Sequence, residues 1–133
     1  MLDEEKRNEL SYRLIGCCLA VHRELGPGLH ESAYEDSLAA EMSVQKIRFE
    51  RQYPVPVLYG GKPVGDPLRL DFLIEGCIVL EVKAVDQTHR VHWAQVLTYL
   101  KLTRLPLGLL VNFNTASLRE GIKRVILTPK TSL

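Results

Sequence analysis

Two neighbouring apolar segments, residues 68–74 and 77–84, constrain the fold of this chain more than any other feature. In both segments the even-numbered positions are apolar, namely Leu70, Phe72, Ile74, Ile78, Leu80 and Val82. Such alternation is typical of β-strands, whose successive side chains point to opposite faces of a sheet. If the even-numbered residues of both strands share one core face, each of them pairs with an even-numbered residue, so the two residue numbers of every pair sum to an even number. The loop between the strands then has an odd number of residues. The pattern therefore predicts a hairpin with a three-residue loop and Gly76 in the left-handed conformation.

The same alternation places three charged residues, Asp71, Glu81 and Lys83, on the other face of this hairpin. Carboxylates held close together repel each other unless a proton or a cation lies between them. Mg²⁺ or Mn²⁺, which prefer carboxylate oxygens, would relieve that repulsion. The Lys83 ammonium could then orient a water molecule or stabilise charge on a phosphate. The alternative is a salt-bridged group on a solvated sheet face, which three such residues alone favour.

The remaining pattern predicts one α/β domain over residues 1–133, in which helices flank a mixed central sheet. The expected order is helix, helix, three strands, helix, strand and strand, at about residues 3–25, 31–45, 49–59, 68–74, 77–84, 89–102, 107–113 and 125–127. Two prolines in the first strand favour an edge position, because proline has no N–H to donate to a neighbouring strand. A helix between two strands favours a partly parallel sheet.

Polar side chains on two of the predicted helices follow helical spacing. In the third helix, Gln95 and Tyr99 are four residues apart, and His92 precedes Gln95 by three. In the second helix, Glu31 and Glu35 are likewise four apart. Each stripe is either part of a functional site or the solvent-facing side of its helix.

Taken in order, these residues resemble a known family. The segment Gly28-Leu29-His30-Glu31-Ser32-Ala33-Tyr34 has the form GxxExxY, and Asp71, the Glu81-Val82-Lys83 triplet and the Gln95/Tyr99 pair follow it. This arrangement resembles the GxxExxY family of the PD-(D/E)XK nuclease superfamily, in its RecB-like branch. The resemblance extends from about Leu10 to Val125 and departs from the motif at Leu70, where the superfamily has proline.

The resemblance implies a restriction-endonuclease-like core and a metal-dependent nuclease. Asp71 and Glu81 would bind Mg²⁺ or Mn²⁺ directly, and Glu31 would complete the metal shell. Lys83 would position the attacking water, and Gln95 and Tyr99 would orient the site. The implied reaction is hydrolysis of phosphodiester bonds, with DNA favoured over RNA as the substrate. The alternative is a module of the same fold that binds nucleic acid or protein without catalysis.

Charge is distributed unevenly along the chain. Residues 1–82 contain nine Lys and Arg against fourteen Asp and Glu, whereas residues 83–133 contain eight against two. Such halves either neutralise each other within the fold or form an acidic metal pocket beside a basic surface that binds phosphates. The residues expected at a nucleic-acid interface are Lys83, His92, Gln95, Tyr99, Arg119, Lys123 and Arg124.

Composition sets the expected cellular setting. Three cysteines without metal-ligand spacing favour a reducing, cytoplasmic environment. The acidic N-terminal residues predict no secretion signal, and no apolar run approaches the length of a membrane helix. A chain of 133 residues offers little surface for substrate specificity, which a homodimer or a partner protein could supply.

Overall fold

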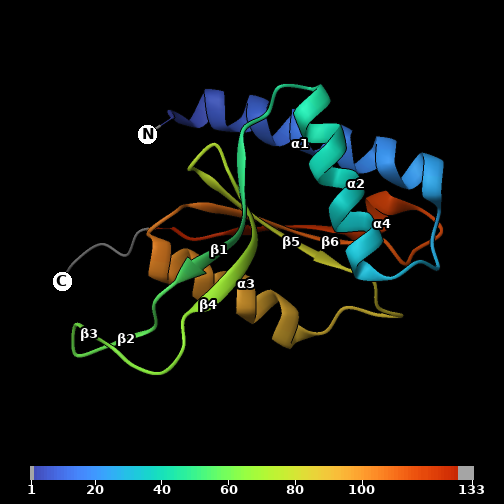
Figure 1. Cartoon of the computed structure of the whole chain (residues 1–133). Coiled ribbons are helices and arrows are strands. Elements are labelled where there is room, and N and C mark those ends of the chain that lie inside the picture. Colours follow the sequence, from blue (N-terminus) through green and yellow to red (C-terminus); the bar gives the residue numbers. More distant parts are fainter. Residues whose placement is uncertain (1, 129–133) are drawn as a thin grey trace.

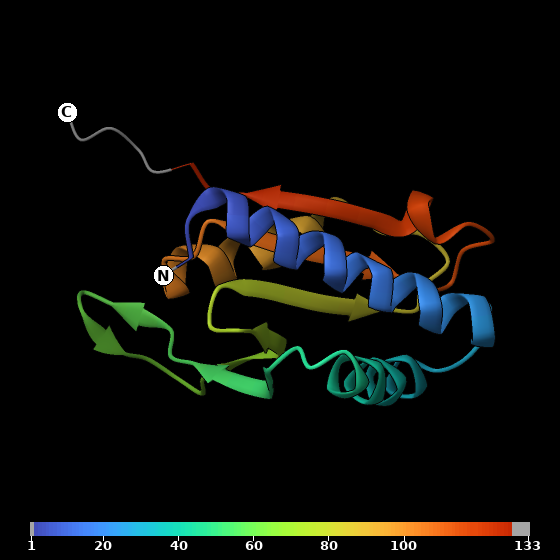
Figure 2. The ribbon, with the colours of Figure 1, turned by 90° about the horizontal axis from the view of Figure 1, so that it is seen from above.

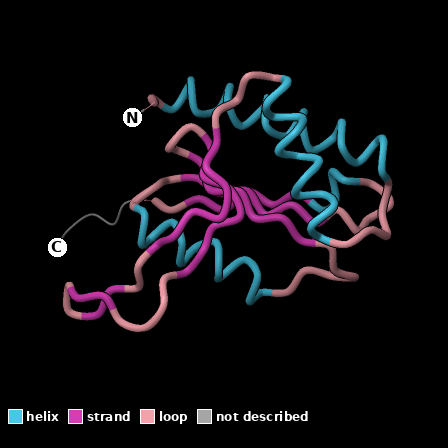
Figure 3. The backbone as a smooth tube through the Cα atoms, in the orientation of Figure 1, coloured by secondary structure: helices cyan, strands magenta, loops and turns pink. Residues whose placement is uncertain are grey.

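The structure of the chain is a computed structural model that describes residues 2–128. A five-stranded sheet lies between two layers of helices (Figures 1 and 3). The helices are α1 (Glu4–Leu25), α2 (Glu31–Val44), α3 (Arg90–Thr103) and the short α4 (Leu118–Gly121). The strands of the sheet are β1 (Phe49–Val55), β4 (Leu68–Ile74), β5 (Ile78–Lys83), β6 (Leu107–Asn112) and β7 (Ile122–Ile126). The α/β class expected from the sequence is confirmed.

The strand order is β1-β4-β5-β6-β7, and the sheet is mixed. Strands β5 and β6 pair in parallel and are joined through α3, whereas the other neighbouring strands pair antiparallel. Pro54 lies in β1, at the edge of the sheet. The parallel portion and the edge position are both confirmed, for the reasons that predicted them.

The β4–β5 hairpin has the predicted register. Phe72 pairs with Leu80, and Ile74 pairs with Ile78. A three-residue turn, residues 75–77, joins the strands, and Gly76 has a φ of 68°. The even-sum register inferred from the alternation is therefore correct.

The assumption that all even-numbered residues share one face is wrong at Leu70. Leu70 packs with Leu73 in the cluster beneath α3, whereas Phe72 packs against α1 and α2 on the opposite face. The alternation breaks at Asp71, and Gln52, opposite it in β1, has a φ of 53°. Both faces of the sheet are buried under helices, so apolar residues occupy even and odd positions alike.

Two other element boundaries differ from the prediction. The strand expected over residues 49–59 ends at Val55, and the chain then forms a separate hairpin of β2 (Leu58–Tyr59) and β3 (Lys62–Pro63). Figure 2 shows this hairpin extending away from the sheet. Pro56 ends the pairing because it has no N–H to donate. The last strand, expected over residues 125–127, spans residues 122–126, where exposed charged side chains on the edge strand obscure its pattern.

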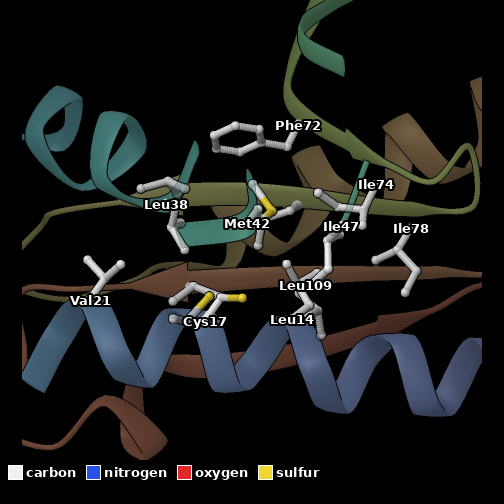
Figure 4. Close-up of a cluster of buried hydrophobic side chains, with 14 of the residues drawn as sticks. Leu14, Cys17, Val21, Leu38, Met42, Ile47, Phe72, Ile74, Ile78 and Leu109 are labelled. Atoms are coloured by element: carbon white, nitrogen blue, oxygen red, sulfur yellow. The ribbon is translucent and has the colours of Figure 1, made fainter. Parts of the chain in front are cut away.

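The larger of two cores fills the space between α1, α2 and the sheet (Figure 4). Side chains such as Leu14, Cys17, Leu38, Phe72 and Leu109 meet there. A second core lies between the sheet and α3, which covers the opposite face (Figure 1). Because helices cover both faces, a polar group within the central strands is largely removed from water.

Within residues 2–128, none of the helices is long and apolar enough to cross a lipid bilayer.

Candidate active site

Strands β4 and β5 pair through their backbones up to Phe72 and Leu80. Beyond this pair, backbone N–H groups of each strand bond to a carboxylate of the other. The backbone N–H of Asp71 donates to Oε1 of Glu81, with a donor–acceptor distance of 2.9 Å. The backbone N–H of Val82 donates to Oδ2 of Asp71 at 2.8 Å. Each carboxylate thus accepts a bond from the backbone of the opposite strand. This reciprocal arrangement fixes both carboxyl groups between the two strands.

The two carboxylates lie in an environment that disfavours two negative charges. Glu81 has only 2% of its surface exposed. Burial raises the pKa of Glu81 to about 8, and the neighbouring Asp71 carboxylate adds to the increase. Burial also raises the pKa of Asp71, although its bond from Val82 opposes the rise. Below pH 8 a proton therefore remains on the pair, at a position where a cation could replace it.

Lys83 follows Glu81 on β5 and supplies the nearest positive charge. Its ammonium favours the charged forms of Asp71, Glu81 and Glu31. The backbone N–H of Phe113 donates to the Lys83 carbonyl at 2.8 Å, which extends the β5–β6 pairing past the lysine. Lys83 is therefore attached to a rigid part of the sheet.

Glu31 approaches this site from the first turn of α2. Burial raises its pKa, and Lys83 is the strongest of its charged neighbours, ahead of Asp71 and Glu35. A hydrogen bond from the Ala84 backbone N–H also favours its charged form. Glu31 thus lies beside the lysine end of β5.

Tyr34, the last residue of the GxxExxY segment, fixes the entry into α2. Its hydroxyl donates to the Gly26 carbonyl at 2.5 Å and accepts a bond from the Leu29 backbone N–H at 3.2 Å. Its ring stacks on Phe113, with centroids 4.6 Å apart. These contacts are structural, and they fix the start of α2, where Glu31 lies near Lys83.

Asn112, at the end of β6, secures the loop that follows Lys83. Its Oδ1 accepts from the Val85 backbone N–H at 3.1 Å, and its Nδ2 donates to the Val85 carbonyl at 2.9 Å. Gly121 packs directly on the Asn112 backbone, where a Cβ atom would lie 2.2 Å from the carbonyl oxygen. Asn112 could not be predicted from the sequence, because its partner Val85 lies far away along the chain.

Glu35 is an additional carboxylate at the site. It is 8% exposed, and its Oε1 accepts from Arg51 Nε at 3.0 Å and from Gln52 Nε2 at 2.8 Å. Its charge contributes to the raised pKa of Asp71. Arg51 also pairs with Asp36, next to Glu35 in the chain. The spacing of four residues from Glu31 was the available signal for Glu35, but it did not distinguish a buried group from a solvated one.

Tyr99 reaches the carboxylate pair from α3. Its hydroxyl donates to the Arg69 carbonyl at 3.4 Å. Burial, together with the charges of Glu81 and Asp71, raises its pKa to about 12. The Gln95 side chain favours the charged form of Tyr99, so these two residues interact as their spacing predicts.

His92 occupies the first turn of α3. Its Nδ1 accepts from the His89 backbone N–H at 3.0 Å, which caps the helix. Partial burial and the nearby charge of Lys83 lower its pKa. His92 therefore lies at the margin of the site, near the lysine.

The basic residues of the C-terminal part are not gathered at the carboxylates. Arg119 lies on α4, and Lys123 and Arg124 lie on the edge strand β7. Arg124 donates to Oγ of Ser11 at 3.1 Å and to Oδ1 of Asn8 at 3.4 Å, so it bonds to α1. Contact between these three residues and nucleic acid stays a prediction.

Within residues 2–128, no three His, Cys, Asp or Glu side chains are gathered closely enough to hold a metal ion. The assignment of Glu31 as a metal ligand beside Asp71 and Glu81 stays a prediction. Lys83 is the strongest charged neighbour of Glu31, whereas Asp71 and Glu81 are bonded to each other's strands. This pair nevertheless suits Mg²⁺, which commonly binds one or two carboxylates and keeps several water ligands.

Comparison with known families agrees with this architecture. The family model described as the PD-(D/E)XK nuclease superfamily matches residues 8–125. The chain therefore belongs to the PD-(D/E)XK nuclease superfamily, and its mixed, helix-flanked sheet is consistent with the restriction-endonuclease-like fold. Members of this superfamily are usually nucleases that use Mg²⁺ or Mn²⁺. No curated protein and no solved structure matches the chain.

Proposed function

We propose that this protein is a Mg²⁺- or Mn²⁺-dependent nuclease of the GxxExxY family, in the RecB-like branch, that hydrolyses phosphodiester bonds of DNA. The observation that carries the proposal is the pair formed by Asp71 and Glu81. Both carboxylates are held by backbone N–H groups, and Glu81 is buried. The Asp71 carboxylate raises the pKa of Glu81, and the Glu35 carboxylate raises the pKa of Asp71. A bound divalent cation would compensate this concentration of negative charge.

Asp71 and Glu81 would hold the metal through their carboxylate oxygens, each of which has two lone-pair sites. A divalent metal in such a site supplies Lewis acidity and lowers the pKa of a water molecule. The backbone bonds to both side chains keep them in place before any ligand arrives. The protein would therefore lose little conformational freedom on binding the ion.

Lys83 would orient the attacking water and stabilise the negative charge that develops on the phosphate. It is not a metal ligand in this proposal, because a protonated amine has no lone pair to donate. Glu31 supports this role, since its carboxylate and the Lys83 ammonium attract each other. Glu31 would complete the metal shell, directly or through water.

Tyr99, Gln95 and His92 would contact the nucleic acid or orient groups that do. Tyr99 is buried with its hydroxyl near the carboxylate pair, whereas Gln95 is exposed on the same side of α3. His92 lies on the first turn of α3, where the helix dipole favours an anionic phosphate. These positions support an approach of the substrate backbone along the N-terminal half of α3.

The proposed cellular setting is the cytoplasm. Support comes from Cys17, Cys18 and Cys77, which are buried free thiols. Because the domain is small, a homodimer or a partner protein is proposed as the source of substrate specificity.

A cleavage assay tests this function. Wild type, Asp71→Asn, Glu81→Gln and Lys83→Ala are incubated with single- and double-stranded DNA and RNA in Mg²⁺ or Mn²⁺. Lys83→Ala is expected to lower the rate about 100- to 1000-fold, the typical effect of removing a group that stabilises transition-state charge. Glu50→Gln, which changes an exposed carboxylate on β1, serves as the control and should cut like wild type.

Two outcomes contradict the proposal. If wild type binds nucleic acid and metal but cuts none of the substrates, the chain is a binding module of the same fold. If all the variants cut as well as wild type, the activity does not belong to this site.

A further inference from the structure

Gln52 has an unusual backbone for a strand residue. It lies within β1 with a φ of 53°, in the left-handed region that residues other than glycine rarely adopt. The register of β1 and β4 places it opposite Asp71. A strained conformation of this kind persists only where the surrounding structure enforces it, and such residues cluster at functional sites.

The Gln52 side chain bridges two carboxylates. Its Nε2 donates to Oε1 of Glu35 at 2.8 Å and to Oδ1 of Asp71 at the longer distance of 3.4 Å. One amide nitrogen, with two protons, thus lies between a buried glutamate and the proposed metal ligand. Arg51, one position earlier in β1, supplies the positive charge that pairs with Glu35.

These contacts account for both oxygens of Asp71. Oδ2 accepts from the Val82 backbone and Oδ1 accepts from Gln52. A carboxylate oxygen has two lone-pair sites, so each oxygen keeps one for a further ligand. Without the amide, the Glu35 carboxylate would face Asp71 directly, and its charge already disfavours the ionised form of Asp71.

We propose that Gln52 is a positioning residue of the candidate active site, whose amide separates Glu35 from Asp71 and fixes the orientation of the Asp71 carboxylate. This inference rests on the proposed function, because it concerns the Asp71 carboxylate as a metal ligand. The left-handed backbone of Gln52 orients its amide toward both Glu35 and Asp71. Hydrogen-bond partners of metal-binding carboxylates typically change metal affinity 10- to 100-fold when they are removed.

Two variants separate the amide from the backbone. Gln52→Gly removes the amide and relaxes the left-handed conformation, since glycine adopts it freely. Gln52→Met keeps the length of the side chain and the backbone strain but has no N–H to donate. Lys46→Gly is the matched control, because Lys46 is another non-glycine residue with a left-handed φ, 59°, in the turn between α2 and β1.

The measurement is Mn²⁺ binding to the metal-free full-length protein by titration calorimetry, with thermal unfolding of each variant recorded in parallel. Both Gln52 variants are expected to bind Mn²⁺ about 10- to 100-fold more weakly than wild type. Lys46→Gly is expected to bind like wild type. A merely structural role would change the unfolding temperature and leave the Mn²⁺ affinity unchanged.

The outcomes separate this inference from the proposed function. If wild type binds Mn²⁺ and both Gln52 variants bind it equally well, the positioning role is overturned while the metal site stands. If wild type does not bind Mn²⁺, the metal site fails and the inference fails with it. If Gln52→Gly does not fold, the affinity of Gln52→Met decides the question.

Discussion

The two ends of the β4–β5 hairpin are built on different principles. At the turn end, Phe72 and Ile74 pair with apolar partners through regular backbone bonds, and their side chains are fully buried. At the open end, Asp71 and Glu81 bond to the opposite strand through their carboxylates. Both ends belong to the same pair of strands, but at the open end Glu81 is buried and Asp71 is half-buried. Burial of apolar side chains stabilises the turn end, whereas burial of carboxylates costs free energy at the open end. This difference indicates a structural role for the turn end and a chemical role for the open end.

The largest effect is expected at the turn end, from Phe72→Ala. The Phe72 ring meets the Phe49 ring edge-on, with centroids 5.4 Å apart, and lies in the larger core. Removing it should lower the free energy of unfolding by about 3–5 kcal/mol, as measured by urea denaturation. Protein that remains folded should bind Mn²⁺ like wild type. A loss of metal affinity in a folded variant would show that the two ends do not act separately.

At the open end, Glu81→Gln should stabilise the metal-free protein at alkaline pH. The pKa of Glu81 is raised to about 8 in the folded state, above its ordinary value of 4.5. The folded wild type therefore holds a proton more tightly than the unfolded chain, and its stability falls as pH rises from about 4.5 to about 8. The neutral Gln side chain lacks this dependence while its oxygen can still accept the bond from Asp71.

The expected gain at pH 8 is roughly 2–4 kcal/mol, on the basis of about 1.4 kcal/mol for each pKa unit. Urea denaturation with a chelator, at pH 5 and at pH 8, measures it. The difference between Glu81→Gln and wild type should be small at pH 5 and large at pH 8. Glu50→Gln should track wild type at both values. An equal difference at the two pH values would mean that Glu81 is not held in a charge-disfavouring environment.

The smallest effect is expected at the turn itself, from Gly76→Ala. Gly76 has a φ of 68°, and an added Cβ would meet no atom within 4 Å, so backbone strain is the only penalty. The free energy of unfolding should fall by about 1–2 kcal/mol, the difference between alanine and glycine in the left-handed region. Thermal unfolding gives the value, and Mn²⁺ affinity should not change. An unaltered unfolding temperature would contradict the turn geometry.

Sequence alternation predicted this hairpin because its signal is local. A period of two, an odd-length loop and one glycine were enough to predict the register. The switch of Leu70 to the α3 face was not predictable in this way. It coincides with the left-handed backbone of Gln52, a residue that belongs to another strand and has no sequence signature of such a conformation.

The candidate site was predictable to a similar extent. Residues two to four positions apart, such as Gln95 and Tyr99, follow strand or helix periodicity and could be grouped from the sequence. Residues that are brought together only by the order of the strands could not be grouped in this way. Glu35 and Gln52 come from different elements, and their effect on Asp71 depends on the β1–β4 pairing. The position of Arg124 was not predictable either, because its charge alone does not indicate that it bonds to Ser11 of α1.

Titration of Mn²⁺ into metal-free wild type, Asp71→Asn and Glu50→Gln tests the central claim most directly. The Asp71 and Glu81 carboxylates are held close together by backbone bonds, and burial disfavours their charged forms, so wild type is expected to bind one Mn²⁺ per chain. Binding should release protons near neutral pH, because the ion displaces the proton that the pair retains. Asp71→Asn should bind much more weakly, since a neutral amide replaces an anionic ligand, and Glu50→Gln should bind like wild type. Absence of binding by wild type, or equal binding by Asp71→Asn, would contradict the claim that this carboxylate pair is a metal site.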